Sequence, residues 1–179
     1  MKVTPGRLNG ILVVEPTVHR DERGFFLERF SRAHYAAAGI DVDFVQDNHA
    51  RSHGGTIRGL HFQVAPGQPK LVSIACGAIF DVVVDIRRSS PTFGEWESFR
   101  LDDERLLQLF VPAGFAHGYC ALSDTADVVY KVGRYYESSA ERGIAWDDPA
   151  IGIAWPIARP LVSARDAANP RLSEIADEL

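Results

Sequence analysis

The residues best suited to chemistry lie in two short segments that are far apart in the sequence. Arg58-Gly59-Leu60-His61-Phe62-Gln63 carries a histidine, and Val129-Tyr130-Lys131 carries a tyrosine. Histidine is a natural general base near neutral pH, and a tyrosine hydroxyl is a natural general acid. If folding brings them to opposite sides of one carbon, they can remove a proton from one face and return it on the other. That chemistry inverts a stereocentre and needs no cofactor.

Short strand-like runs dominate the sequence and must position these residues. Clusters of Gly, Pro, Ser and Asp separate the runs, and about ten short strands at this spacing are typical of an antiparallel sandwich or jelly-roll barrel. We therefore expect one all-β domain over residues 1–179, with a few short peripheral helices. The expected strands are Ile11–Glu15, Gly24–Phe30, Asp43–His49, Thr56–Gln63, Lys70–Cys76, Ala78–Arg87, Glu95–Leu101, Gln108–Pro112, Phe115–Leu122 and Thr125–Val132.

Two regions outside the strands favour helix. Ser31 is a good N-cap, residues 33–38 are rich in alanine, and Gly39 is a good helix stop. The pattern changes again after Trp155-Pro156, where residues 163–179 indicate short helical turns packed on the barrel. In the expected strand at residues 80–87, one face is wholly apolar. The other face carries Asp81 and Asp85, which would line a polar cavity or face solvent.

Composition and charge narrow the class of protein. The net charge of −5 argues against a nucleic-acid binder, which would normally carry a basic stripe. Only three of the 19 basic residues are lysine, and arginine suits phosphate and carboxylate groups. No apolar run approaches the roughly 20 residues of a membrane span, and the N-terminus has no apolar signal core, so we expect a cytoplasmic protein. Cys76 and Cys120 lie in apolar runs and are expected to be buried thiols.

Several familiar motifs are absent from the sequence. It contains no dinucleotide-binding Gly-x-Gly-x-x-Gly after a strand, no Walker A loop, no Gly-x-Ser-x-Gly and no His-Glu-x-x-His. Pro112-Ala113-Gly114-Phe115-Ala116-His117 matches a stretch common in cupin barrels, many of which bind a metal. The earlier part of such a site would need a His-x-His pair and a carboxylate, whereas here it offers only His61. We expect no metal and no cofactor.

A series of longer motifs runs in order over nearly the whole chain. They are Arg23-Gly24-Phe25-Phe26-x-Glu28, Gln46-Asp47-Asn48-His49, the segment from Arg58 to Gln63, Lys70-Leu71-Val72, the segment from Phe80 to Arg87, Ser90-Pro91-Thr92-Phe93-Gly94, the segment from Pro112 to Gly118, Tyr130-Lys131, the segment from Gly143 to Pro149, the segment from Ile151 to Pro156, and Ser163-x-x-Asp166. Together they resemble the dTDP-4-dehydrorhamnose 3,5-epimerase family of the rhamnose pathway, which has a cupin-like jelly-roll barrel.

The resemblance implies a substrate and a set of catalytic residues. The substrate would be dTDP-4-keto-6-deoxyglucose, inverted at C3 and C5 through an enolate at O4. His61 resembles the base, and Asp166 resembles the carboxylate that holds its ring. Tyr130 resembles the general acid, Lys70 resembles the residue that stabilises the enolate oxygen, and His117 resembles a supporting histidine. Without the resemblance, His61 could equally be a strand histidine bonded to backbone, Tyr130 a core aromatic, and Lys70 a surface lysine.

The resemblance also implies a nucleotide site and a homodimer. Arginines would hold the diphosphate, while the other side chains would bind the base and nearby atoms. In the family the segment from Arg23 to Glu28 reaches a neighbouring subunit. The residues implied for substrate binding are Arg23, Glu28, Gln46, Asn48, Arg58 and, through a pairing with Lys70 or His117, Asp81.

One geometric conflict yields a prediction about the strand that carries His61. Strict alternation would put Arg58 and His61 on opposite faces of that strand, although both are implied to face the substrate. A bulge or bend at Gly59 would bring them to one face, and we predict one there.

Alternative functions remain open from the sequence. The same residues would serve an epimerase acting at C3 or C5 alone, and the loop from Val64 to Pro69 could alter which carbon reacts. An isomerase that moves the keto group, a metal-dependent cupin oxygenase and a non-catalytic sugar-binding jelly roll are the others.

Overall fold

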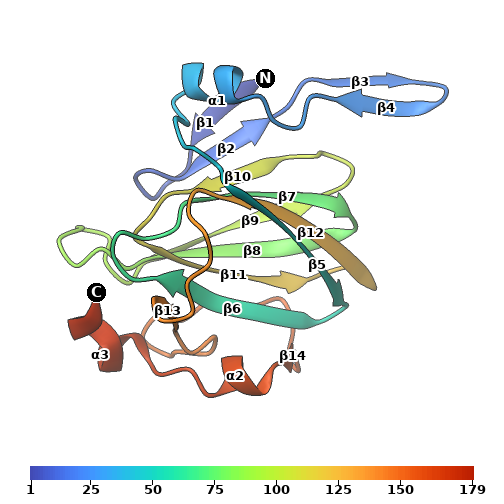
Figure 1. Cartoon of the computed structure of the whole chain (residues 1–179). Helices are drawn as coiled ribbons and strands as arrows, with labels where there is room; N and C mark the ends of the chain where they lie inside the picture. Colours follow the sequence, from blue (N-terminus) through green and yellow to red (C-terminus); the bar gives the residue numbers. More distant parts are fainter.

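Two six-stranded sheets form the barrel in the computed structural model, which describes residues 1–179 (Figure 1). The first sheet has the order β1-β2-β10-β7-β12-β5, and the second has the order β13-β6-β11-β8-β9 with β14 beside β6. All pairings are antiparallel except that of β14 with β6. This arrangement confirms the predicted antiparallel jelly roll. The strands are β1 Lys2–Pro5, β2 Leu12–Glu15, β3 Val18–Asp21, β4 Gly24–Leu27, β5 Gln46–His53, β6 Thr56–Gln63, β7 Lys70–Cys76, β8 Ala78–Asp85, β9 Trp96–Asp102, β10 Gln108–Val111, β11 Phe115–Ala121, β12 Thr125–Val132, β13 Glu141–Gly143 and β14 Leu161–Val162.

The predicted strands agree with these bounds to differing degrees. β6, β7 and β12 have the predicted bounds. β5 starts three residues later than predicted and continues to His53, and β4 ends at Leu27 instead of Phe30. The sequence did not reveal β1, β3, β13 or β14. These strands have two to four residues each and hold their place by pairing with a neighbour, so they carry little apolar pattern of their own.

Three apolar clusters hold the layers together. The largest lies inside the barrel between the sheets, a second lies between the outer face of the second sheet and the C-terminal segment, and a third lies under the early helix. The apolar face of β8 (Val82 and Val84) belongs to the second cluster, so the opposite face points into the barrel. Asp81 and Asp85 on that inner face have no exposed surface, which excludes the solvent-facing interpretation.

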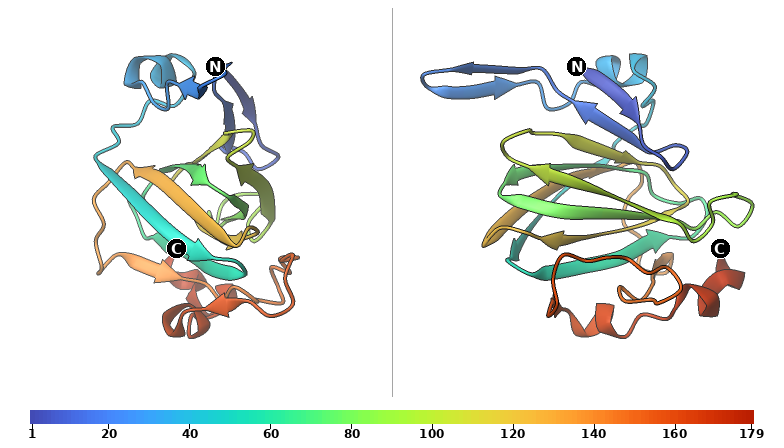
Figure 2. Two further views of the ribbon diagram at one scale, coloured as in Figure 1. Left: turned by 90° about the vertical axis from the view of Figure 1, so that its right-hand side faces the viewer. Right: turned by 180° about the vertical axis from the view of Figure 1, so that it is seen from behind.

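Short helices cover both ends of this layered structure (Figure 2). Helix α1 spans Arg32–Ala37, begins after Ser31 and is followed by Gly39 with φ +93°, as predicted, although the Ser31 side chain makes no capping hydrogen bond. The C-terminal segment contains the predicted helical turns and packs along β6. These are α2 Ala164–Ala167, α3 Leu172–Ile175 and the 3₁₀ turn η1 Ala176–Glu178.

The hairpin of β3 and β4 projects from the barrel instead of packing on it (Figures 1 and 2). Its aromatic side chains are unusually open, with Phe25 at 52% and Phe26 at 70% exposure. Large apolar side chains in contact with water mark a surface that a partner can cover.

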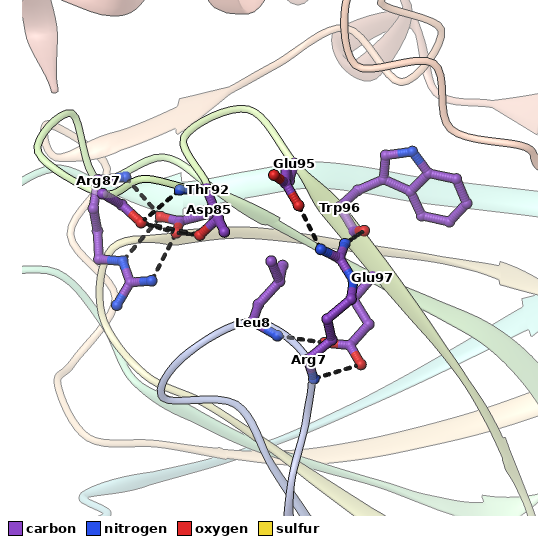
Figure 3. Close-up of polar contacts among 9 residues, drawn as sticks. Arg7, Leu8, Asp85, Arg87, Thr92, Glu95, Trp96 and Glu97 are labelled. Carbon is purple, nitrogen blue, oxygen red and sulfur yellow. Dashed lines mark hydrogen bonds and ion pairs between the residues drawn. The ribbon is translucent and has the colours of Figure 1, made fainter.

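The closed end of the barrel is held by two polar clusters (Figure 3). In the first, the buried carboxylate of Asp85 accepts hydrogen bonds from Arg87, Ser90 and Thr92, which fixes the loop between β8 and β9. In the second, Glu97 accepts hydrogen bonds from the backbone N–H groups of residues 7 and 8 at 2.9 and 3.0 Å. This contact draws the N-terminal loop, with its buried leucine, over the barrel interior.

We expect Asp85→Asn to destabilise the protein by about 2–3 kcal/mol near neutral pH, because it removes a buried charge with charge-assisted partners. Burial acts to raise the pKa of Asp85, but the hydrogen bonds from Arg87, Ser90 and Thr92 hold it well below its ordinary value. A lowered folded-state pKa contributes stability above the unfolded pKa of about 3.9, and this contribution is lost as the pH falls further. Urea unfolding at pH 7 and pH 3 should therefore show a larger gap between variant and parent at pH 7. An equal gap at both pH values would contradict this account.

Two further observations complete the fold. Both cysteines are free; Cys120 is buried as predicted, but Cys76 is exposed because it ends β7 at the barrel rim, so that part of the prediction was wrong. No helix is long and apolar enough to cross a membrane.

Candidate active site

A cavity of about 270 Å³ lies between the two sheets at the open side of the barrel. Its walls come from three parts of the chain: the first sheet, the second sheet and the C-terminal segment. The lining residues are Ala50, Arg58, His61, Lys70, His117, Gly118, Tyr119, Val128, Tyr130, Ser163, Arg165 and Asp166. Six of the residues selected from the sequence therefore face one cavity, and they are Arg58, His61, Lys70, His117, Tyr130 and Asp166.

The predicted bulge brings Arg58 and His61 to the same face of β6. His61 pairs with His117 on β11, and Arg58 pairs with Tyr119, so two residues of β6 stand opposite Gly118 alone. Gly59 has φ +130°, and a Cβ atom there would lie 2.6 Å from the Gly118 Cα. The bulge therefore requires glycine at position 59, where no side chain would fit.

His61 and Asp166 form a hydrogen-bonded pair in the cavity wall. His61 Nε2 lies 2.6 Å from Asp166 Oδ1, and the Gly59 N–H donates to Asp166 Oδ2 at 3.3 Å. Burial acts to raise the pKa of Asp166, but the hydrogen bond and charge of His61 and the N–H of Gly59 hold it below its ordinary value. Asp166 is therefore ionised and fixes the His61 proton on Nε2. The lone pair on Nδ1 has no partner within the chain and is available to accept a proton.

A second histidine–aspartate pair lies beside the first. His117 Nε2 is 3.0 and 2.9 Å from the two carboxylate oxygens of Asp81, which is wholly buried. Asp81 contacts His117, one of the two partners considered from the sequence, and does not itself line the cavity. Its position behind His117 suits a residue that orients the histidine, and a direct contact between Asp81 and a ligand is not what the structure shows.

Lys70 and Tyr130 face the histidines from the opposite sheet. They start β7 and lie near the end of β12, two adjacent strands of the first sheet. Burial lowers the pKa of Lys70, and the negative charges of Glu141 and Asp81 oppose that shift. Burial and the charge of Glu141 raise the pKa of Tyr130, whereas Arg58 and Asn48 lower it. A raised pKa keeps the Tyr130 hydroxyl protonated at neutral pH, as a general acid requires.

Arg58 is an uncompensated cation at the cavity wall. Its Nε donates to Ser52 Oγ at 2.9 Å and its Nη2 donates to the Arg51 carbonyl at 3.1 Å, and both acceptors are neutral. It makes no ion pair within the chain, so its charge is free to attract an anion.

The other residues selected for ligand binding lie outside the cavity. Gln46 and Asn48 continue the inner face of β5 beyond Ala50, and the Gln46 amide donates to Asn48 at 2.8 Å. Asn48 is the cross-strand partner of Tyr130, which places it at the cavity margin. Arg23 pairs with Asp21 on the projecting hairpin, and Glu28 contacts His34 at 2.6 Å. A single chain therefore does not bring the ends of the segment from Arg23 to Glu28 to the cavity.

The C-terminal segment delivers Asp166 to a histidine that is 105 residues away in the sequence. Ser163 caps α2 by accepting the Asp166 N–H at 3.1 Å, which starts the turn beside β6. Further along, the Asn169 amide lies flat on Gly143 of β13, where a Cβ atom would come within 2.4 Å of it. Gly143 itself pairs with His61, so the tail is seated directly over the catalytic strand.

Sequence reasoning missed three polar residues in or beside the cavity. Tyr119 follows His117 by two on the same strand face, and Ser52 follows Asn48 by four on β5, so alternation could have identified both. Glu141 forms an ion pair with Arg165 at 3.4 Å and affects the pKa of Lys70 and Tyr130, but its strand is too short to carry a pattern. No group of three or more His, Cys, Asp or Glu side chains is arranged to hold a metal ion.

Known proteins share this chain's sequence and fold over nearly their whole length. The model of a family described as dTDP-4-dehydrorhamnose 3,5-epimerase matches residues 5–174. The dTDP-4-dehydrorhamnose 3,5-epimerase of Shigella flexneri is 49% identical over 168 residues, which is 93% of each chain.

Solved structures agree with the sequence comparison. The dTDP-6-deoxy-D-glucose-3,5-epimerase of Legionella pneumophila, solved with dTDP-4-keto-L-rhamnose, superimposes with a TM-score of 0.96 at 42% identity, covering 99% of this chain and 96% of that one. A 4-keto-6-deoxy sugar epimerase of Streptomyces spheroides gives 0.95 at 38% identity, covering 99% and 90%. The chain belongs to the dTDP-4-dehydrorhamnose 3,5-epimerase family.

Proposed function

We propose that this protein is an isomerase that inverts C3 and C5 of dTDP-4-keto-6-deoxyglucose, giving dTDP-4-keto-rhamnose for dTDP-rhamnose synthesis. The observation that carries the proposal is one cavity with the His61–Asp166 pair in one wall and Tyr130 in the other. Base and acid on opposite walls can act on opposite faces of one sugar carbon. Family membership and the ligand-bound relative from Legionella pneumophila support the choice of substrate.

Proton abstraction begins at His61. C3 and C5 both flank the C4 ketone, so loss of a proton from either carbon gives an enolate with its charge on O4. His61 Nδ1 takes the proton, and ionised Asp166 stabilises the imidazolium that forms. Tyr130 then donates its hydroxyl proton to the other face of the carbon. All the required groups are side chains of the protein, and the proposal needs no cofactor.

Lys70 stabilises the enolate in this proposal. Its ammonium group lies in the same cavity, and a cation placed where negative charge develops lowers the barrier directly. We expect Lys70→Met to reduce kcat by about 10²-fold or more. Steady-state assays should show this loss in kcat, with dTDP affinity changed much less. A Lys131→Met variant, which removes a lysine paired with Asp47 outside the cavity, is the control.

Proton NMR in deuterated water, without added metal, tests the function. Loss of both the H3 and H5 signals of dTDP-4-keto-6-deoxyglucose, with inversion at both carbons, would support the double epimerase. Loss of one signal would indicate the single-site alternative and direct attention to residues 64–69. Absence of exchange at either carbon would refute the proposal.

The projecting hairpin supports a homodimer as part of the proposal. Phe25 and Phe26 are exposed on it, and Arg23 lies at its tip outside the chain's own cavity. A second copy would cover the aromatic side chains, and Arg23 would then act at the neighbour's nucleotide site.

Mixed dimers can test this arrangement. Arg23→Ala and His61→Ala should each be impaired at subsaturating substrate. Refolding them together at equal amounts should restore about a quarter of the parental activity, because half of the dimers then carry one complete site. Lack of complementation, or a monomer in sedimentation velocity, would contradict the arrangement.

A further inference from the structure

The inference concerns how Arg58 is held, and it rests on the proposed function. Arg58 lines the cavity with a charge that no carboxylate neutralises. A long arginine side chain at a cavity wall loses considerable rotamer entropy when it binds an anion, unless it is already fixed. Whatever fixes the guanidinium therefore sets part of the ligand affinity.

Ser52 supplies the central contact. It is on β5, is 2% exposed, and its hydroxyl accepts the Arg58 Nε–H at 2.9 Å. The same hydroxyl lies 3.0 Å from the hydroxyl of Tyr119, which is also buried. Tyr119 is on β11 and is the cross-strand partner of Arg58 on β6. The Ser52–Tyr119 hydroxyl pair therefore links three strands beneath one arginine.

The contacts leave one part of the guanidinium unused. Nε is bound by Ser52 and Nη2 by the Arg51 carbonyl, so β5 holds that edge of the group. Nη1 makes no hydrogen bond within the chain and keeps both of its N–H donors. Because the acceptors on β5 are neutral, the contact orients Arg58 without cancelling the charge that a phosphate would meet.

We propose that Ser52 and Tyr119 are positioning residues that hold Arg58 ready for a phosphate group of the nucleotide-sugar. Neither residue needs to touch the ligand for this role. Their contribution is to the affinity for the diphosphate, because Arg58 is ordered before the ligand arrives, and their effect on proton transfer is secondary.

Calorimetric titration with dTDP tests the proposal in a double-mutant cycle of Ser52→Ala and Arg58→Met. Ser52→Ala should weaken dTDP binding about 10-fold, the size expected for a lost hydrogen bond to a charged group. The same substitution should have almost no effect on dTDP binding in the Arg58→Met background, since nothing remains to be positioned. For the nucleotide-sugar, the loss should fall on KM more than on kcat.

Two further variants separate positioning from general damage. Tyr119→Phe removes only a hydroxyl, so it should weaken dTDP binding by about 3-fold, and again only when Arg58 is present. Ser73→Ala removes a comparable serine–arginine hydrogen bond, that of Ser73 with Arg29 at 2.9 Å, outside the cavity. It should leave dTDP affinity unchanged.

The possible outcomes separate this inference from the proposed function. Equal weakening by Ser52→Ala in both backgrounds, or none in either, would overturn the positioning role while leaving the epimerase intact. Failure of the unaltered protein to bind dTDP would overturn the proposed function together with the inference.

Discussion

His61→Ala is expected to lower turnover by at least about 10³-fold and to abolish exchange of the H3 and H5 protons with solvent. The reason lies in the geometry of its ring. Nε2 is committed to Asp166 at 2.6 Å, and Nδ1 is the ring nitrogen that remains to accept a proton. His117 cannot replace it without breaking its own contacts with the buried Asp81. Proton NMR in deuterated water measures exchange and inversion in one experiment.

His49→Ala provides a matched control for the His61 variant. His49 Nε2 lies 3.1 Å from Asp127, so it also forms a histidine–aspartate pair, but outside the cavity. Its removal should leave exchange and turnover close to those of the parent. Retained exchange in His61→Ala would remove His61 from the role of base, and His117 would be the next residue to test.

The barrel could be predicted because its strands carry their own signals. β6, β7 and β12 are long enough to show apolar alternation between turn residues, and their bounds agree with the prediction. The three-residue strand β13 shows no such pattern, because its place depends on pairing with β6. Alternation also left open whether Asp81 and Asp85 face solvent or the interior. Partners from elsewhere in the chain, His117 for Asp81 and Arg87 for Asp85, make their burial possible.

The site was predicted unevenly for the same physical reason. The conflict between Arg58 and His61 could be resolved from the sequence, since only a bulge brings both to one face. No local pattern links Asp166 to His61, and without the family resemblance it would read as an ordinary helical aspartate. Ser52 was overlooked because a serine in a polar strand resembles a solvent-exposed one. Its burial depends on β11, which supplies Tyr119 from 67 residues away.

Tyr130→Phe should separate two steps that His61→Ala removes together. We expect inversion to fall by about 10²-fold or more, while exchange of H3 or H5 with solvent deuterium persists. His61 can still form the enolate and can return a deuteron to the face from which it took the proton. That return restores the starting configuration, so signal is lost without inversion. The Tyr130 hydroxyl is the donor that the first sheet offers on the other face.

The comparison with Tyr119→Phe makes this prediction specific to the position of the hydroxyl. Tyr119 also lines the cavity, but its hydroxyl is bonded to Ser52 on the Arg58 side. Its variant should therefore keep the parental ratio of inversion to exchange, whatever it does to affinity. A parallel fall of exchange and inversion in Tyr130→Phe would mean that Tyr130 is needed for abstraction itself. The proton donor would then have to be another residue of the cavity wall, and His117, on the sheet that carries His61, would be the next candidate.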